Sequence, residues 1–394
     1  MIEFGDCRET MRRWKEQGVK AQTCVTSPPY YGLRDYGTAK WDGGDAMCDH
    51  AVRVDPKIES STLSGGKATI GHQREGFKKV CLRCGALRID DQLGLEETPE
   101  QYIKAMVEVF RCVWDVLADD GTLWLNIGDS YAGSGKGQWK DGEHDPKKAK
   151  TNGMKMAIQK PLDIGCKPKD LIGIPWMLAF ALRAAGWYLR QDIIWHKPNP
   201  MPESVQDRCT KAHEYIFLLS KSQKYYFDNE AIAEPVTQST VKRLSQPNLE
   251  NQAGSDRVPG KTNGNMKAVG SQRLAQGAID RTGGLLSGGT ENSTLGVSAV
   301  GTRNRRSVWT VTTKPYSGAH FATFPPDLIE PCILAGAPVN GVVLDPFMGS
   351  GTTAAVAVLN GRNYLGCELN PAYKELQDIR IRDAHLETAQ MELI

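Results

Sequence analysis

The chain has 394 residues, 40% of them hydrophobic, and a formal net charge of +2. It can therefore bury a large core, while its near-neutral charge does not single out a nucleic-acid partner. No apolar run reaches the roughly 18 residues of a membrane span, and Glu3, Asp6 and Arg8 interrupt any signal peptide, so we expect a cytoplasmic protein. Ten cysteines without a secretory signal predict free thiols and a metal site rather than disulfides.

The first motif follows a strand predicted at residues 22–25 and reads Ser27-Pro28-Pro29-Tyr30. Two prolines form a rigid turn at a strand's carboxyl end, where open α/β sheets place their sites. The exocyclic amine of a nucleobase is a weak nucleophile because its lone pair is delocalised into the ring. Acceptors at Ser27 and at the Pro28 carbonyl would draw it towards tetrahedral geometry, and the Tyr30 ring offers a stacking face for a flipped base. The alternative is a proline-stiffened loop with an aromatic plug.

An insertion at residues 41–91 contains the candidate metal ligands Cys48, His50, Cys81 and Cys84. A Cys-x-x-Cys-Gly knuckle together with a Cys-x-His pair suits a four-coordinate structural zinc. The polar loop between the two pairs has too few apolar residues to fold around a core of its own, so a metal would supply its folding energy. The alternative is a surface loop of unconnected thiols, with His72 as a competing ligand.

Helices and strands alternate through the middle of the chain. Helical periodicity and apolar runs predict helices at residues 98–117 and 171–185, strands at residues 122–127 and 188–195, and an edge hairpin at residues 213–219 and 224–228. This alternation predicts a mostly parallel sheet with helices on both faces. Between about residues 236 and 307 the composition changes, and residues 241–306 hold ten Lys and Arg against four Asp and Glu.

A second motif, near the C-terminal end, joins a strand at residues 342–345 to a helix at residues 352–359. It reads Asp345-Pro346-Phe347-Met348-Gly349-Ser350-Gly351-Thr352-Thr353. Its glycines let the backbone approach a ligand closely, and its hydroxyl residues offer N–H groups and hydroxyls to a carboxylate. The motif predicts a cofactor crevice.

The next strand, at residues 363–367, ends at Glu368, which lies 23 residues beyond Asp345. An acidic group in this position is suited to a ribose diol. The third glycine of a dinucleotide fingerprint is missing, so the pattern favours a nucleoside cofactor without a pyrophosphate.

Together the two motifs resemble the β-group of DNA amino-methyltransferases, the permuted class in which the catalytic motif precedes the S-adenosylmethionine motif. The resemblance extends to residues 320–325, His-Phe-Ala-Thr-Phe-Pro, which match the family's third cofactor element. It implies a Rossmann-like α/β fold with a mostly parallel sheet and permuted motif order, interrupted by polar insertions. Only one helical stretch, residues 371–386, follows Glu368, so the strand at residues 2–4 is expected to complete the cofactor half.

The resemblance also assigns candidate site residues. Ser27, Pro28, Pro29 and Tyr30 form the catalytic motif. Cofactor contacts are expected from Asp6, His320, Phe321, Ala322, Thr323, Phe324, Asp345, Pro346, Phe347, Gly349, Ser350, Gly351, Thr352, Thr353, Glu368 and Asn370. In the family an acidic residue at the end of the first strand contacts the adenine ring, and Asp6 is the candidate here. Its alternative role is the N-cap of a helix that begins near Glu9.

The order of motifs in the family places the sequence-reading region between the predicted hairpin and the cofactor elements. We therefore expect Arg303, Arg305 and Arg306 to contact phosphates or guanines, or else to lie in a segment that tethers DNA non-specifically. Trp195, His196 and Lys197 match an element beside the target pocket. A core tryptophan and a hydrogen-bonded histidine are the alternative.

The implied organisation has four parts. Residues 1–40 and 92–235 form the target-base half, residues 41–91 a zinc-knuckle insertion, residues 236–307 a DNA-recognition insertion, and residues 308–394 the S-adenosylmethionine half. The implied partners are double-stranded DNA and a cognate restriction endonuclease, in the cytoplasm of a bacterial or phage-infected cell, with the protein acting as a monomer or homodimer.

The implied reaction is site-specific methylation of an exocyclic amine in DNA by base flipping and direct transfer. Among relatives, serine at the first motif position goes mostly with N4 of cytosine and aspartate mostly with N6 of adenine, with exceptions. We therefore favour N4 of cytosine at Ser27, with N6 of adenine as the alternative. A methyltransferase for RNA or a protein amide, and a non-catalytic DNA-binding protein, are less favoured.

Overall fold

The computed structural model describes residues 1–32, 40–45, 47–48, 81, 83–89, 92–132, 165–167, 169–237, 239, 302–313 and 324–391. The predictions for His50, His72 and residues 320–323 lie outside these ranges. So does most of both polar insertions. Among the helices within the described ranges, none has the length and apolar character needed to cross a membrane.

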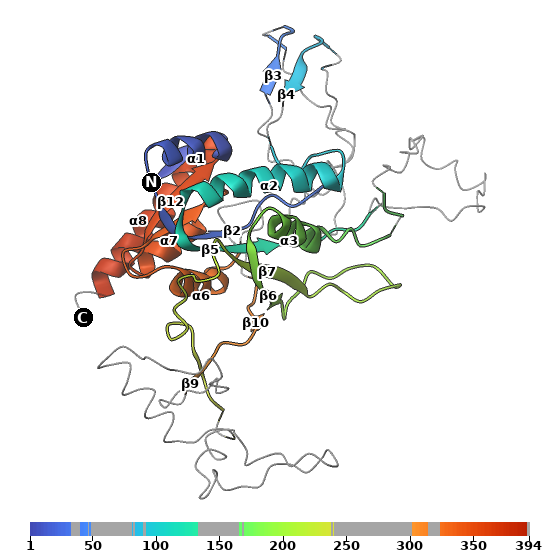
Figure 1. Cartoon of the computed structure of the whole chain (residues 1–394). Helices are drawn as coiled ribbons and strands as arrows, with labels where there is room; N and C mark the ends of the chain where they lie inside the picture. Colours follow the sequence, from blue (N-terminus) through green and yellow to red (C-terminus); the bar gives the residue numbers. More distant parts are fainter. Residues whose placement is uncertain are drawn as a thin grey trace, which may run out of the picture. The chain divides into compact units, whose positions relative to one another are not determined.

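An eight-stranded sheet organises the described chain (Figure 1). Its strands lie in the order β1-β12-β11-β2-β5-β7-β6-β10. The strands are β1 (Ile2–Phe4), β2 (Ala21–Thr26), β5 (Leu117–Ile127), β6 (Tyr188–His196), β7 (His213–Ser220), β10 (Val308–Thr310), β11 (Val342–Asp345) and β12 (Asn363–Glu368). β7 is antiparallel to both its neighbours, and the other pairings in this sheet are parallel. The predicted α/β fold with a mostly parallel sheet is confirmed.

The N-terminal strand completes the cofactor half of the sheet. β1 pairs in parallel with β12, with Ile2 opposite Gly366 and Phe4 opposite Glu368. This confirms the predicted placement of residues 2–4. Because the carboxyl ends of parallel strands meet at one edge of a sheet, β1, β12, β11, β2 and β5 deliver the residues that follow them to a common edge.

Two groups of helices cover the sheet (Figure 1). The first contains α1 (Cys7–Glu16), α2 (Pro99–Val116) and α3 (Ile174–Ala184), and the second contains α6 (Pro326–Gly336), α7 (Thr352–Leu359) and α8 (Lys374–Met391), with the 3-10 turn η4 (Pro371–Tyr373) before α8. Alternate side chains of β5 distinguish the two faces. Leu123 and Leu125 belong to the core that contains α2, whereas Trp124 lies close to Gly336 of α6.

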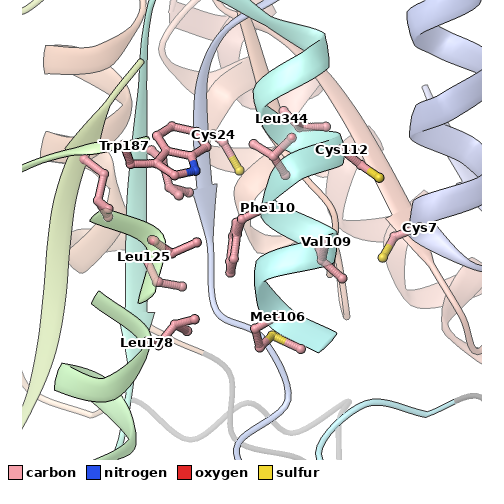
Figure 2. Close-up of a cluster of buried hydrophobic side chains, with 14 of the residues drawn as sticks. Cys7, Cys24, Met106, Val109, Phe110, Cys112, Leu125, Leu178, Trp187 and Leu344 are labelled. Atoms are coloured by element: carbon pink, nitrogen blue, oxygen red, sulfur yellow. The ribbon is translucent and has the colours of Figure 1, made fainter. Parts of the chain in front are cut away.

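The core beneath α2 explains why this helix forms where the sequence predicts it. Met106, Val109 and Phe110 recur at helical spacing and pack with Leu125 of β5 and Leu178 of α3 (Figure 2). The helix begins with Thr98 as its N-cap, accepting a hydrogen bond from the Gln101 N–H, and has Pro99 in its first turn. Both features favour a helix start at this point.

The predicted edge hairpin of residues 213–219 with residues 224–228 is wrong. β7 lies inside the sheet, hydrogen bonded on one side to β5 and on the other to β6. No edge of β7 is left for residues 224–228, which form no strand. The Tyr226 N–H instead donates to the Asp120 carbonyl (3.0 Å).

The chain divides into two compact units, Met1–Tyr226 with Val308–Ile394, and Phe227–Ser307. In the first unit a separate ladder joins β3 (Lys40–Asp42) and β4 (Leu87–Ile89) in antiparallel fashion. In the second unit β8 (Glu234–Pro235) pairs with β9 (Thr302–Arg303).

The packing of α2 predicts the effect of a core truncation. Phe110 is fully buried, so Phe110→Ala should lower the free energy of unfolding by about 3–5 kcal/mol. Chemical denaturation of the full chain measures this loss. Lys104→Ala, on the exposed side of the same helix, should change the free energy by less than about 0.5 kcal/mol. Equal midpoints for the two variants would contradict the packing described.

Candidate active site

The catalytic-motif turn follows β2 directly and is held by the core below it. The Tyr102 hydroxyl of α2 donates to the Pro29 carbonyl (2.8 Å). Gly94 also lies against this turn, because a Cβ there would be 3.0 Å from the Tyr30 carbonyl oxygen. Among the described residues, no side chain or loop N–H donates to the carbonyl of Pro28. One carbonyl of the turn is thus held by the core, and the preceding one keeps its acceptor capacity.

A polar network holds the Tyr30 hydroxyl. It donates to a Glu214 carboxylate oxygen (2.8 Å) and lies 3.2 Å from the side-chain oxygen of Asn126. Ser27 Oγ lies 3.5 Å from the same hydroxyl, at the outer limit of a hydrogen bond. Lys197 donates from its ammonium group to the other oxygen of Glu214. Burial raises the pKa of Tyr30, and the Glu214 charge raises it further, so the phenol remains a proton donor.

The Tyr30 ring packs against the residue that follows β5. A Cβ on Gly128 would lie 2.6 Å from Tyr30 Cε2, so only glycine fits there without displacing the ring. The ring and its hydroxyl are therefore fixed from two directions. Stacking of a base on this ring stays a prediction.

The Asp345 carboxylate joins the two sequence motifs. It accepts hydrogen bonds from the Thr26 hydroxyl (2.6 Å), the Thr353 hydroxyl (2.6 Å) and the Phe347 N–H (2.9 Å). The residue is only 1% exposed. Burial raises the pKa of Asp345 to about 6, against the opposing effect of these hydrogen bonds. The carboxylate therefore fixes the turn after β2 relative to the turn after β11.

The hydroxyls of the Gly-rich turn are engaged with α8. Ser350 Oγ and Thr352 Oγ1 accept from the Arg380 guanidinium (2.8 and 2.7 Å), and the Gln377 amide donates to the Gly349 carbonyl (2.7 Å). We predicted these hydroxyls as partners of a ligand carboxylate. The structure shows them accepting from Arg380 and thereby docking α8 on the turn. Because an accepting hydroxyl can still donate its own proton, contact of these hydroxyls with a ligand stays a prediction.

Two glycines give this turn its path. Gly349 and Gly351 have φ of +54° and +83°, in the left-handed region that favours glycine. At Gly351 a Cβ would also come within 3.3 Å of the Gln377 Cα, so a side chain there would require α8 to shift slightly.

Glu368 lies at the end of β12, facing the same turn. Its carboxylate accepts from the Gly349 N–H (2.7 Å) and the Asn370 N–H (2.8 Å). Burial raises the pKa of Glu368 to about 7. A carboxylate accepts about four hydrogen bonds, so capacity remains for two further donors, as a ribose diol would supply. This carboxylate and the open glycine turn fit the predicted nucleoside cofactor.

Asp6 and the remaining cofactor candidates have different surroundings. Asp6 accepts from the Arg8 N–H (2.7 Å) and caps α1, so the alternative N-cap role is confirmed. Burial acts to raise the pKa of Asp6, but hydrogen bonds and charge from Arg8 outweigh it and lower the pKa. Phe347 packs against the main core. Phe324 is half-buried just before α6, and contact of Asp6, Phe324, Pro346, Phe347 or Asn370 with a cofactor stays a prediction.

The predicted contact of Trp195 with DNA is wrong. The residue is 4% exposed and its indole N–H donates to the Val311 carbonyl (2.8 Å), because β10 pairs along β6 and covers it. The alternative prediction, a core tryptophan, is confirmed. His196 Nδ1 is 3.1 Å from Thr310 Oγ1, and the Lys197 ammonium lies 4.1 Å from the centre of the Trp195 ring.

The three arginines predicted to bind DNA all lie in the second unit. Arg303 and Arg306 both approach the Glu234 carboxylate, at 3.4 and 3.2 Å. Arg305 is half-buried between them. Their contacts with DNA stay a prediction.

The structure brings together three of the four predicted metal ligands. The sulfur atoms of Cys48, Cys81 and Cys84 all lie within 4.8 Å of one another. His50 lies outside the described residues.

Two sets of site residues were missed in the sequence. Glu214 lies at the amino end of β7, whereas the predicted catalytic and cofactor motifs follow carboxyl ends of strands. Because β7 is antiparallel, its amino end reaches the same edge of the sheet, and an antiparallel neighbour is the signal that finds it. Gln377 and Arg380 lie on a mostly polar helix, and no local pattern marks them as partners of the Gly-rich turn.

Comparison with known proteins agrees with this site. A family model described as DNA methylase matches residues 21–378. The type II methyltransferase M.Cfr9I of Citrobacter freundii is 37% identical over 378 residues, covering 96% of this chain and 86% of that protein. M.SmaI of Serratia marcescens is 38% identical over 383 residues, covering 96% and 90%.

A solved structure of a putative DNA modification methylase from Thermus thermophilus, complexed with S-adenosyl-L-methionine, is 18% identical with a TM-score of 0.45, covering 97% of this chain and 93% of that one. The family match and the two full-length relatives decide the assignment. This chain belongs to the DNA methylase family of amino-methyltransferases.

Proposed function

We propose that this protein transfers a methyl group from S-adenosylmethionine to N4 of cytosine at a specific site in double-stranded DNA. The observation that carries the proposal is the hydrogen-bonded frame around Asp345, which holds the Ser27-Pro28 turn beside the Gly-rich turn. Acceptors for an amine and a crevice for a nucleoside are thereby fixed at neighbouring strand ends. N6 of adenine is the alternative target within the same family.

Ser27 and Pro28 act as acceptors for the amine. When Ser27 donates its own proton to the Tyr30 oxygen and Tyr30 donates to Glu214, the lone pairs of Ser27 are left for the incoming amine. The Pro28 carbonyl supplies the second acceptor. By accepting hydrogen bonds from the amine, both groups raise the electron density on its nitrogen. They also stabilise the positive charge that develops there, which lowers the barrier to alkylation. No His or Lys accepts the Ser27 proton among the described contacts, so Ser27 is not a nucleophile.

The cofactor half supplies the second substrate of the reaction. Glu368 would accept from the ribose hydroxyls, the Ser350 N–H of the Gly-rich turn would donate to the carboxylate, and Asp6 would lie near the adenine ring. S-adenosylmethionine, when bound, would supply the sulfonium methyl group for direct transfer to the amine nitrogen without a covalent enzyme intermediate. The new N–CH3 bond replaces the S–CH3 bond, S-adenosylhomocysteine is the leaving group, and the alkylated nitrogen loses one N–H proton to solvent. The role of the chain is to orient the two reactants and to exclude water.

The choice of base rests on Ser27, since serine at this motif position goes mostly with N4 of cytosine in the family. A cognate restriction endonuclease is part of the proposal, in keeping with the type II names of the two relatives.

Mass spectrometry of nucleosides tests the proposed function. DNA of mixed sequence is incubated with the full chain and methyl-labelled S-adenosylmethionine, then digested. We expect label in N4-methylcytosine. Label in N6-methyladenine would overturn the base assignment but keep the reaction class, and unlabelled DNA from a folded, cofactor-binding protein would overturn both.

The acceptor role of Ser27 predicts a separation of binding from catalysis. Ser27→Ala removes a hydroxyl that interacts with the amine mainly in the transition state, so transfer should fall by at least about 100-fold. Binding of S-adenosylmethionine, measured by calorimetry, should stay within about twofold. Ser204→Ala, at an exposed serine, is the matched control and should match the parent in both. Parent-like turnover of Ser27→Ala would refute the assigned role.

The raised pKa of Glu368 predicts a pH dependence of cofactor binding. Hydroxyl donors favour the carboxylate over the carboxylic acid, which predominates below a pKa of about 7 in the free protein. The dissociation constant should therefore rise as the pH falls from about 8 to 6, approaching tenfold per unit at the acid end.

Glu368→Gln is the control, because the cofactor's own titration is the same for both proteins. The variant should bind S-adenosylmethionine about tenfold more weakly at pH 8. Its dissociation constant should lack the rise at acid pH that is attributed to Glu368. Identical pH profiles for the two proteins would contradict the assignment.

A further inference from the structure

The three cysteines of the 41–91 insertion form a cluster that the methyl-transfer proposal does not use. The sulfur atoms of Cys48, Cys81 and Cys84 lie within 4.8 Å of one another, and those of Cys48 and Cys81 are 3.8 Å apart. None of the three is in a disulfide. We propose that they bind a structural zinc ion that folds this insertion.

The separation of the sulfurs suits a metal. A zinc–sulfur bond of about 2.3 Å in a tetrahedral site places two sulfur ligands about 3.8 Å apart, as seen for Cys48 and Cys81. A disulfide would require a separation of about 2.05 Å. The sulfurs are therefore close enough to share one metal ion and too far apart for a disulfide.

The backbone around the cluster is shaped to present the sulfurs. The Gly85 N–H donates to the Cys81 carbonyl (2.8 Å), and the Cys81 N–H donates to the Ala86 carbonyl (2.7 Å), which makes residues 81–86 a tight knuckle. Gly85 has φ of +78°. Across the cluster, a Cβ on Gly44 would lie 2.7 Å from Cys84 Sγ, so the chain before Cys48 also closes against the sulfurs.

The ligands lie at one end of the β3–β4 ladder. β3 ends at Asp42, paired with Leu87, the first residue of β4. Cys48 follows β3 and Cys84 precedes β4, so both reach the end of the ladder that Asp42 and Leu87 close. A metal there would join the two strands where the chain leaves them.

The apolar side chains of β4 contribute little burial to this ladder. Leu87 and Ile89 of β4 are 52% and 48% exposed, so their apolar side chains are not buried in a core. A two-stranded ladder without an apolar core is marginally stable at best in water. A structural zinc contributes folding free energy directly, which is what such a ladder needs.

Two residues that flank the insertion in the sequence, Gly32 and Gly94, lie beside the catalytic motif. The Gly32 N–H donates to the Gly94 carbonyl (2.8 Å), and Gly94 in turn lies against the Tyr30 carbonyl. The described chain on both sides of the insertion is therefore held next to the Ser27–Tyr30 turn. The sequence predicts His50 as the fourth ligand, and the structure brings together the three cysteine ligands.

Metal analysis of the full chain tests the inference. Tag-free protein from zinc-supplemented cells should contain about one zinc ion per chain by inductively coupled plasma mass spectrometry. The single variants Cys48→Ser, Cys81→Ser and Cys84→Ser should each retain less than about a tenth of it. Cys166→Ser and Cys209→Ser, two cysteines outside the cluster, should keep the parent content. A parent protein that is folded and free of zinc, or a Cys81→Ser variant with full zinc content, would overturn the proposal.

Cobalt exchange keeps the proposal testable where a serine variant fails to fold. Zinc is removed from the parent with a chelator and replaced by Co²⁺, a spectroscopic substitute for zinc. We expect thiolate-to-cobalt charge-transfer absorption together with the intense visible bands of a tetrahedral site. Cobalt bound without thiolate absorption, or no cobalt bound, would overturn it. The readout is independent of methyl transfer, so its outcome is distinct from that of the proposed function.

Discussion

The buried carboxylate of Asp345 is the interaction on which the site depends. The Thr26–Asp345 hydrogen bond spans 319 positions of the sequence and lies just beyond the point where β2 and β11 pair in parallel. A buried carboxylate is costly unless its oxygens are hydrogen bonded, and here Thr26, Thr353 and the Phe347 N–H provide the bonds. Any displacement of one turn would leave this group unsatisfied. The permuted order of motifs is thus compatible with one rigid site.

A second carboxylate, Glu214, steadies the catalytic turn through the Tyr30 hydroxyl. It reaches the site because β7 runs antiparallel to β5 and β6 and brings its amino end to the edge where parallel strands finish. The Lys197 ammonium forms an ion pair with Glu214, and the Asn126 side-chain amide donates to the same carboxylate. The Ser27–Tyr30 turn is therefore held by Asp345 through Thr26 and by Glu214 through Tyr30. Such rigidity suits acceptors that must be in place before charge develops.

The sequence predicted the frame of the molecule well because its signals are local. The period of α2, the turn after β2 and the Gly-rich turn before α7 depend on neighbouring residues, and each was found within a few positions. Strand partners depend on distant residues, so the hairpin at residues 224–228 and the position of β7 were wrong. The prediction that Trp195 contacts DNA was wrong for the same reason, because its burial depends on the pairing of β10 with β6.

The difference between local signals and distant contacts also applies to the Gly-rich turn. Ser350, Thr352 and Thr353 are small polar residues, and their hydroxyls are satisfied by Arg380 and Asp345 inside the protein. They shape the turn, and contact of these hydroxyls with a ligand stays a prediction. Two N–H groups of the turn are engaged as well, since the Gly349 N–H donates to Glu368 and the Gly351 N–H donates to the Met348 carbonyl. The Glu368 carboxylate keeps capacity for further donors. Because Glu368 already accepts from the Gly349 N–H, a ribose bound to it would sit against the turn that Asp345 holds beside Ser27. The frame that holds the proposed acceptors would thus also position the methyl donor.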